Sequence, residues 1–267
     1  MNLSKKFILI IVDGVGMRDK IENNAFKLAK TPTFDKLFSN SPWSTLGASE
    51  QFVGLPKGIS GNSEIGHMTI GSGRVLKHDL VRINESISND NLKLNVNLIN
   101  YFKALKSRDG NLHLIGLVSD GGVHSNLSHI IPIIEIAQSY NIKNIYLHAI
   151  TDGRDTSPFD GVNYIKELEK NFKKYHNVEI ATIIGRYFAM DRDQRWERTE
   201  KAYRLFTENK GKIFTSSINA IEESYNNKIT DEFIEPIVLE KYKSNRMKSN
   251  DGILCFNFRS DRMRQIC

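Results

Sequence analysis

Charged side chains follow four apolar runs beyond residue 110, each at the point where the run ends. The runs are 111–118, 144–150, 178–184 and 252–258. The residues that follow them are His124, Arg154, Asp155, Arg186, Arg192, Arg259 and Arg262. The arginine guanidinium matches phosphate and carboxylate groups with two parallel hydrogen bonds and stays charged at any working pH. These arginines therefore predict a site for a small, multiply charged anion, with Asp155 as a general acid or base.

The elements that must position these side chains are predicted from the alternation of apolar runs with segments of helical period. Short continuous apolar runs are typical of strands buried on both faces, and the alternation indicates an α/β fold with a mainly parallel sheet. Ligands of such sheets lie beyond the carboxyl ends of the strands. We therefore expect the arginines to meet in one crevice, although a single arginine is more often part of a surface ion pair, as Asp191 with Arg195 would be.

Two further candidates lie near the N-terminus. Asp13 directly follows the apolar run 7–12, which predicts a buried strand, and its carboxylate is placed either as a ligand for a hard metal ion or as the cap of a turn. Ser63 lies in the glycine-rich stretch 58–73, where it is either a helix N-cap or an activated nucleophile.

Composition narrows the function classes. The net charge of +6 allows an anionic partner, but the lysines are scattered through helix-like stretches such as 164–175, which does not favour nucleic acid. Only two cysteines occur, Cys255 and Cys267, as in proteins of a reducing compartment. The apolar run 7–12 is too short for a signal peptide, and no run approaches a membrane span. A cytoplasmic protein without a membrane partner is expected.

Several long motifs resemble cofactor-independent phosphoglycerate mutases. They are ILIIVDGVG, NAFKLAKTPTFDKL, VGLPKGISGNSEIGHMTIGSGRV, LIGLVSDGGVHS, HAITDGRDTSP, IIGRYFAMDRDQRWERTEKAY and FNFRSDR, in this order over the chain. The resemblance implies an alkaline-phosphatase-like domain, incomplete here, with an inserted α/β transferase domain. Residues 1–77 would belong to the former and residues 78–267 to the latter.

The resemblance also implies an activity and its residues. The family interconverts 3-phosphoglycerate and 2-phosphoglycerate with two manganese or magnesium ions, needs no 2,3-bisphosphoglycerate and acts as a monomer. Ser63 would carry the phosphoryl group, Asp13 and Ser63 would bind metal, and Asp155 would move a proton between the glycerate hydroxyls. The substrate would be held by His124, Arg154, Asp155, Arg186, Arg192, Arg259 and Arg262.

The sequence departs from the family because the returning half of the phosphatase domain, with its remaining metal ligands, has no counterpart here. We expect a truncated form whose isolated chain is inactive. A non-catalytic fragment that binds phosphoglycerate is the alternative for the chain, and a related metal-dependent phosphohydrolase or phosphopentomutase is the alternative for the enzyme. A nucleic-acid-binding module is the rival from another class.

Overall fold

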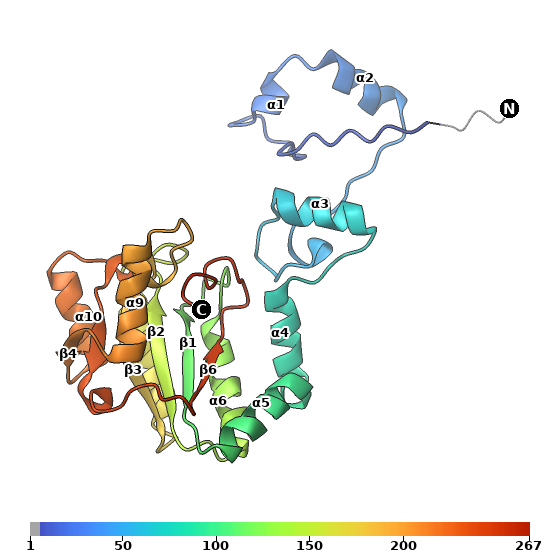
Figure 1. The fold of residues 1–267 in the computed structure, drawn as a ribbon. Coiled ribbons are helices and arrows are strands. Elements are labelled where there is room, and N and C mark those ends of the chain that lie inside the picture. The colour runs from blue at the N-terminus through green and yellow to red at the C-terminus, as the bar shows by residue number, and fades with distance from the viewer. Residues whose placement is uncertain (1–5) are drawn as a thin grey trace. The chain divides into compact units, whose positions relative to one another are not determined.

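The computed structural model describes residues 6–267. The chain divides into two compact units, Met1–His78 and Asp79–Cys267. Figure 1 shows the elements of each unit, and the two are described separately below. The assignment of these units to a phosphatase and a transferase domain stays a prediction.

The second unit is built on a six-stranded sheet in the order β4-β5-β3-β2-β1-β6. The pairs β6–β1, β1–β2, β2–β3 and β4–β5 are parallel, whereas β5 pairs antiparallel with β3. The α/β fold with a mainly parallel sheet is thus confirmed. The strands are β1 (Leu112–Val118), β2 (Ile145–Thr151), β3 (Val178–Gly185), β4 (Lys212–Phe214), β5 (Ile237–Leu239) and β6 (Gly252–Cys255).

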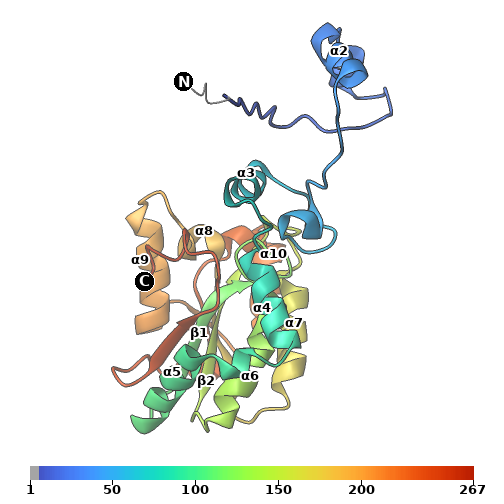
Figure 2. The ribbon, with the colours of Figure 1, turned by 90° about the vertical axis from the view of Figure 1, so that its right-hand side faces the viewer.

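Helices cover both faces of this sheet (Figure 2). One face packs against α5, α6, α7 and α10, and the other packs against α8 and α9. Burial on both faces explains why every residue of β1 and β2 is buried. The helices of this unit are α4 (Asp79–Ser88), α5 (Val96–Ser107), α6 (Ile130–Ser139), α7 (Gly161–Phe172), α8 (Arg186–Ala189), α9 (Trp196–Glu208) and α10 (Ser217–Asn226). Short 3₁₀ turns lie at Leu92–Leu94, Leu127–His129, Asp231–Phe233 and Glu240–Tyr242.

Strand β6 is held beside β1 by polar contacts at both of its ends. Before it, the Asp251 carboxylate accepts a hydrogen bond from the backbone N–H of Asn111 at 2.8 Å and lies 3.2 Å from Nε2 of the buried His113. After it, the Asn257 side chain accepts from the backbone N–H of Leu117 at 2.8 Å. These contacts fix the segment that leads to Arg259 and Arg262.

The described part of the first unit contains α1 (Ala25–Leu28), α2 (Pro32–Asn40), a 3₁₀ turn (Glu50–Val53) and α3 (Ser63–Ser72). The strand predicted over 7–12 is wrong here, since these residues form no strand and Phe7 is 89% exposed. Between residues 6 and 78 no strand is present to pair with this run, and a strand needs a partner for its backbone groups. Among residues 6–267, no helix has the length and apolar character that a membrane crossing requires.

Candidate active site

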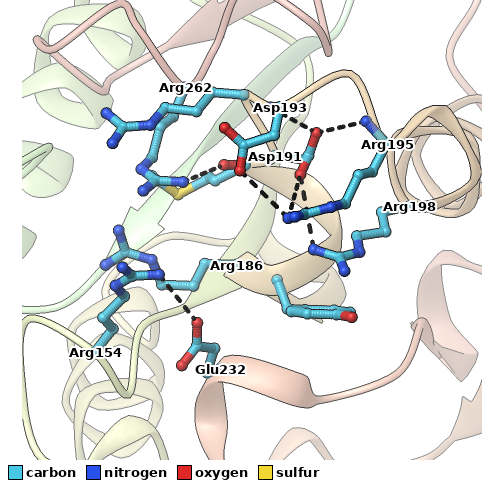
Figure 3. Close-up of a pocket in the computed structure, with 11 residues that line it drawn as sticks. Arg154, Arg186, Asp191, Asp193, Arg195, Arg198, Glu232 and Arg262 are labelled. Atoms are coloured by element: carbon cyan, nitrogen blue, oxygen red, sulfur yellow. Dashed lines mark hydrogen bonds and ion pairs between the residues drawn. The ribbon is translucent and has the colours of Figure 1, made fainter.

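A cavity of about 140 Å³ in the second unit gathers arginines from segments that are far apart in the sequence (Figure 3). They come from the turn after β2, from α8, from the loop between α8 and α9, from α9 itself and from the segment after β6. The positive residues of the lining are Arg154, Arg186, Arg192, Arg195, Arg198 and Arg262, and the negative ones are Asp191, Asp193 and Glu232. The excess of arginines suits an anionic ligand.

The buried carboxylate of Asp152 organises the β2 end of this site. It accepts hydrogen bonds from Arg186 Nη1 at 2.6 Å, from the Ser119 hydroxyl at 2.7 Å and from the backbone N–H of Asp155 at 3.0 Å. Burial would raise the pKa of Asp152, but the hydrogen bonds from Asp155 and Ser119, together with the Arg186 charge, hold it below its usual value. One ionised side chain therefore fixes both Arg186 and the turn that carries Arg154 and Asp155.

Arg186 connects Asp152 to Asp155. The same Nη1 atom lies 2.6 Å from Asp155 Oδ2, and the Arg186 residue is only 3% exposed. Asp155 Oδ2 also lies 3.8 Å from Nε2 of His124. The candidate acid–base group is thus held by a buried arginine next to a buried imidazole.

His124 and Asp261 extend this network to two more arginines. Nδ1 of His124 lies 3.8 Å from Asp261 Oδ1, and the Asp261 carboxylate pairs with Arg192 at 2.8 Å and with Arg259 at 3.0 Å. Burial, reinforced by the Arg186 charge, lowers the pKa of His124 to about 4. The imidazole is therefore neutral near pH 7 and can hydrogen-bond a ligand without adding charge.

Arg262 shows the signature of an incompletely compensated cation. Burial lowers its pKa, and the charges of Arg192, Arg186 and Arg154 lower it further. Its Nη1 donates to the Met190 carbonyl at 2.9 Å, but its buried Nε has no hydrogen-bond partner among the described residues. An anion in the cavity would relieve the repulsion among the arginines.

In the first unit, the structure brings Asp13 and Ser63 together. The Ser63 hydroxyl donates to Asp13 Oδ2 at 2.6 Å, and His67 Nδ1 lies 3.3 Å from the same hydroxyl oxygen. Ser63 is the first residue of α3, whose N-cap is Asn62, so the interpretation of Ser63 as the N-cap is wrong. The glycine-rich stretch is therefore partly helical.

The Asp13–Ser63 pair offers only part of a metal centre. Both residues offer the oxygen ligands that manganese and magnesium accept, but octahedral coordination of these ions takes about six ligands. Within residues 6–267, no group of three or more His, Cys, Asp or Glu side chains is arranged to hold a metal ion. The described residues thus supply a pair of oxygen ligands but not a complete shell.

Most of the predicted anion-binding residues meet in the second unit. Arg154, Arg186, Arg192 and Arg262 line the cavity, whereas His124, Asp155 and Arg259 join it through Arg186 and Asp261. The predicted Asp191–Arg195 contact is present at 3.9 Å, but both residues line the cavity as well. The functional roles of these residues stay predictions.

Sequence reasoning missed Asp152, Asp261, Arg198 and Glu232. Asp152 and Asp261 could have been found by the rule that selected Asp13, since each is a carboxylate that closely follows a predicted strand. Arg198 is inside α9 with its guanidinium carbon 3.7 Å from the Tyr187 ring centroid, and Glu232 follows no predicted strand. Nothing in the local sequence marks these two.

Comparisons with known proteins identify the family of the chain. Residues 83–267 match the family described as BPG-independent PGAM N-terminus. The chain is 46% identical over 264 residues to 2,3-bisphosphoglycerate-independent phosphoglycerate mutase of Clostridium novyi, covering 98% of this chain and 52% of that protein. It is 49% identical over 264 residues to the protein of the same name in Aliarcobacter butzleri, covering 99% of this chain and 52% of the relative.

A solved structure is similar as well. It is Leishmania mexicana phosphoglycerate mutase at low cobalt concentration, with a TM-score of 0.74 and 31% identity, covering 95% of this chain and 49% of that one. The chain thus spans about half the length of the relatives that it matches. Because the family model matches most of the chain and the relatives and the solved structure agree with it, the chain belongs to the 2,3-bisphosphoglycerate-independent phosphoglycerate mutases, of which it matches the N-terminal part.

Proposed function

We propose that the whole protein carrying this sequence interconverts 3-phosphoglycerate and 2-phosphoglycerate through a phosphoserine at Ser63, and that the second unit holds the glycerate. The observation that carries the proposal is the cavity lined by Arg154, Arg186, Arg192 and Arg262, joined to Asp155 through Arg186. The names of the relatives support the reaction, which runs without 2,3-bisphosphoglycerate.

The residues of the second unit suit a phosphorylated hydroxy acid. The arginines would bind its phosphate and carboxylate groups and keep the dephosphorylated glycerate from leaving. Asp155 would move a proton between the two hydroxyls as each in turn loses or accepts the phosphoryl group. Neutral His124 would orient the ligand by hydrogen bonding, because its lowered pKa keeps it uncharged near pH 7.

The family resemblance is the basis for proposing two manganese or magnesium ions. Asp13 and Ser63 would be two of their ligands, and the others would lie outside the described residues. A metal ion next to a serine hydroxyl favours its deprotonated, nucleophilic form. For the same reason we propose that a protein limited to these 267 residues binds phosphoglycerate without turning it over.

The test is a coupled assay of the whole protein with 3-phosphoglycerate and manganese, followed by mass spectrometry of acid-quenched enzyme. We expect 2-phosphoglycerate to form and a phosphoryl group to be found on Ser63. Release of inorganic phosphate from varied monoesters without isomerisation would point to a phosphohydrolase, and turnover of pentose phosphates alone would point to a phosphopentomutase. Either result would overturn the proposal.

A further inference from the structure

The turn Asp231–Phe233 contributes Glu232 to the lining of the arginine cavity, and two glycines of neighbouring segments leave room for its backbone. Gly153 has a φ of +67°, and a Cβ atom there would lie 2.8 Å from the backbone nitrogen of Glu232. A side chain at Gly185 would collide with the carbonyl group of Glu232. The turn can therefore approach these two positions only because both are glycines without a side chain.

The turn is also tied to the loop that carries Arg154. The buried Asp231 carboxylate accepts hydrogen bonds from the Tyr225 hydroxyl at 2.6 Å and from the backbone N–H of Gly161 at 2.7 Å. Its backbone carbonyl accepts from the Thr151 hydroxyl at 2.7 Å, and its N–H donates to the Pro158 carbonyl at 2.9 Å. Three of these four contacts hold the turn against residues 151–161, and the fourth joins it to Tyr225 of α10.

This turn presents the Glu232 carboxylate to the cavity (Figure 3). Glu232 Oε1 lies 3.6 Å from Arg154 Nη1, and the Glu232 side chain is 21% exposed. The other two acidic residues of the lining are engaged differently, since Asp191 accepts from backbone N–H groups and Asp193 pairs with Arg195. Glu232 is the carboxylate of the lining that faces Arg154.

We propose that Glu232 is a selectivity residue, which disfavours small inorganic anions and favours an anion that also carries a hydroxyl group. An inorganic anion that binds Arg154 from the cavity lies next to the negative charge of Glu232 and competes with it for Nη1. A phosphorylated hydroxy acid can donate a hydroxyl hydrogen bond to Glu232 while its anionic group binds the arginines. This inference rests on the proposed function, because it takes phosphoglycerate as the ligand of the cavity.

The experiment compares two ligands by isothermal titration calorimetry of the 267-residue chain at low ionic strength. The ligands are 3-phosphoglycerate and inorganic sulfate, which stays fully ionised at neutral pH and has no hydroxyl donor. In Glu232→Gln, sulfate affinity should rise about two- to five-fold, the range that corresponds to a partly exposed ion pair. The affinity for 3-phosphoglycerate should not rise, so its preference over sulfate should fall by at least about two-fold.

The matched control is Glu200→Gln, which removes the same charge from the second unit, where Glu200 pairs with Arg204 on α9 at 2.6 Å. Neither affinity should change in this variant. The inference is overturned if Glu232→Gln leaves the preference for 3-phosphoglycerate unchanged, whether both affinities stay or rise together. If the unsubstituted chain prefers sulfate or binds neither ligand, the proposed function fails first, and the inference fails with it.

Discussion

Replacement of Arg186 by Met should destabilise the second unit more than any change of an exposed arginine of the site. The residue is 3% exposed, and its Nη1 lies 2.6 Å from both Asp152 Oδ1 and Asp155 Oδ2. Asp152 itself is 1% exposed, so the substitution leaves a buried carboxylate without its cation. Breaking a buried pair in this way costs about 3–5 kcal/mol of unfolding free energy.

The control for this prediction is Arg192→Met. Arg192 has a side chain that is 46% exposed and pairs with Asp261 at 2.8 Å. Loss of an exposed pair costs about 0–1 kcal/mol. A double variant, Arg186→Met with Asp152→Asn, should be more stable than Arg186→Met alone, because the uncompensated charge is gone.

Urea denaturation measures these differences. In a Trp43→Phe background, the fluorescence of Trp196 reports on the second unit, since the sequence holds two tryptophans. The reasoning is refuted if Arg186→Met loses less than about 1 kcal/mol, or if it loses no more than Arg192→Met.

Three further predictions concern pH and catalysis. Burial lowers the pKa of His129 to about 4. The free energy of unfolding should therefore be highest above pH 6.5 and fall by up to about 3 kcal/mol as the pH drops to about 4. In His129→Asn, the midpoint of urea unfolding should depend less on pH over this range. Burial raises the pKa of Asp231 to about 6. Its ionisation should therefore lower the free energy of unfolding as the pH rises from about 4 to 6. Urea unfolding of Asp231→Asn over the same pH range should lack this loss. Ser63→Ala should abolish turnover by the whole protein while leaving 3-phosphoglycerate binding to the 267-residue chain within about two-fold of its original value; turnover by Ser63→Ala, or by the unsubstituted 267-residue chain with manganese, would contradict the roles proposed here.

Long apolar runs made part of the fold predictable. Strands β1, β2 and β3 lie within or close to predicted runs, because burial on both faces leaves little place for polar residues. The edge strand β6 was also found, but it ends at Cys255, three residues before the predicted run does, and Ile253 in it is exposed. Strands β4 and β5 have three residues each, too few to show a period. Helix α3 was hidden by its glycines, although Asn62 accepts from the Ile65 N–H as an N-cap should.

The site was predictable only where its residues follow strands. Arg154, Arg186 and Arg262 were found because the ends of parallel strands meet at one edge of a sheet. Glu232 was not found, because its place depends on glycines that lie some 50 to 80 residues earlier in the chain. For the run 7–12 a strand was predicted but is absent. Its apolar pattern fits a strand, but the described part of its unit contains no other strand with which it could pair.

The most direct test of the account is calorimetric titration of the 267-residue chain with 3-phosphoglycerate. We predict saturable binding to one site, weakened about ten-fold or more in Arg262→Met, because a hydrogen bond to a charged group contributes about 1.5–3 kcal/mol. Arg204→Met, which removes an arginine from the outer surface of α9, should bind as the unsubstituted chain does. Absence of binding, or equal weakening in both variants, would contradict the claim that the arginine cavity holds phosphoglycerate.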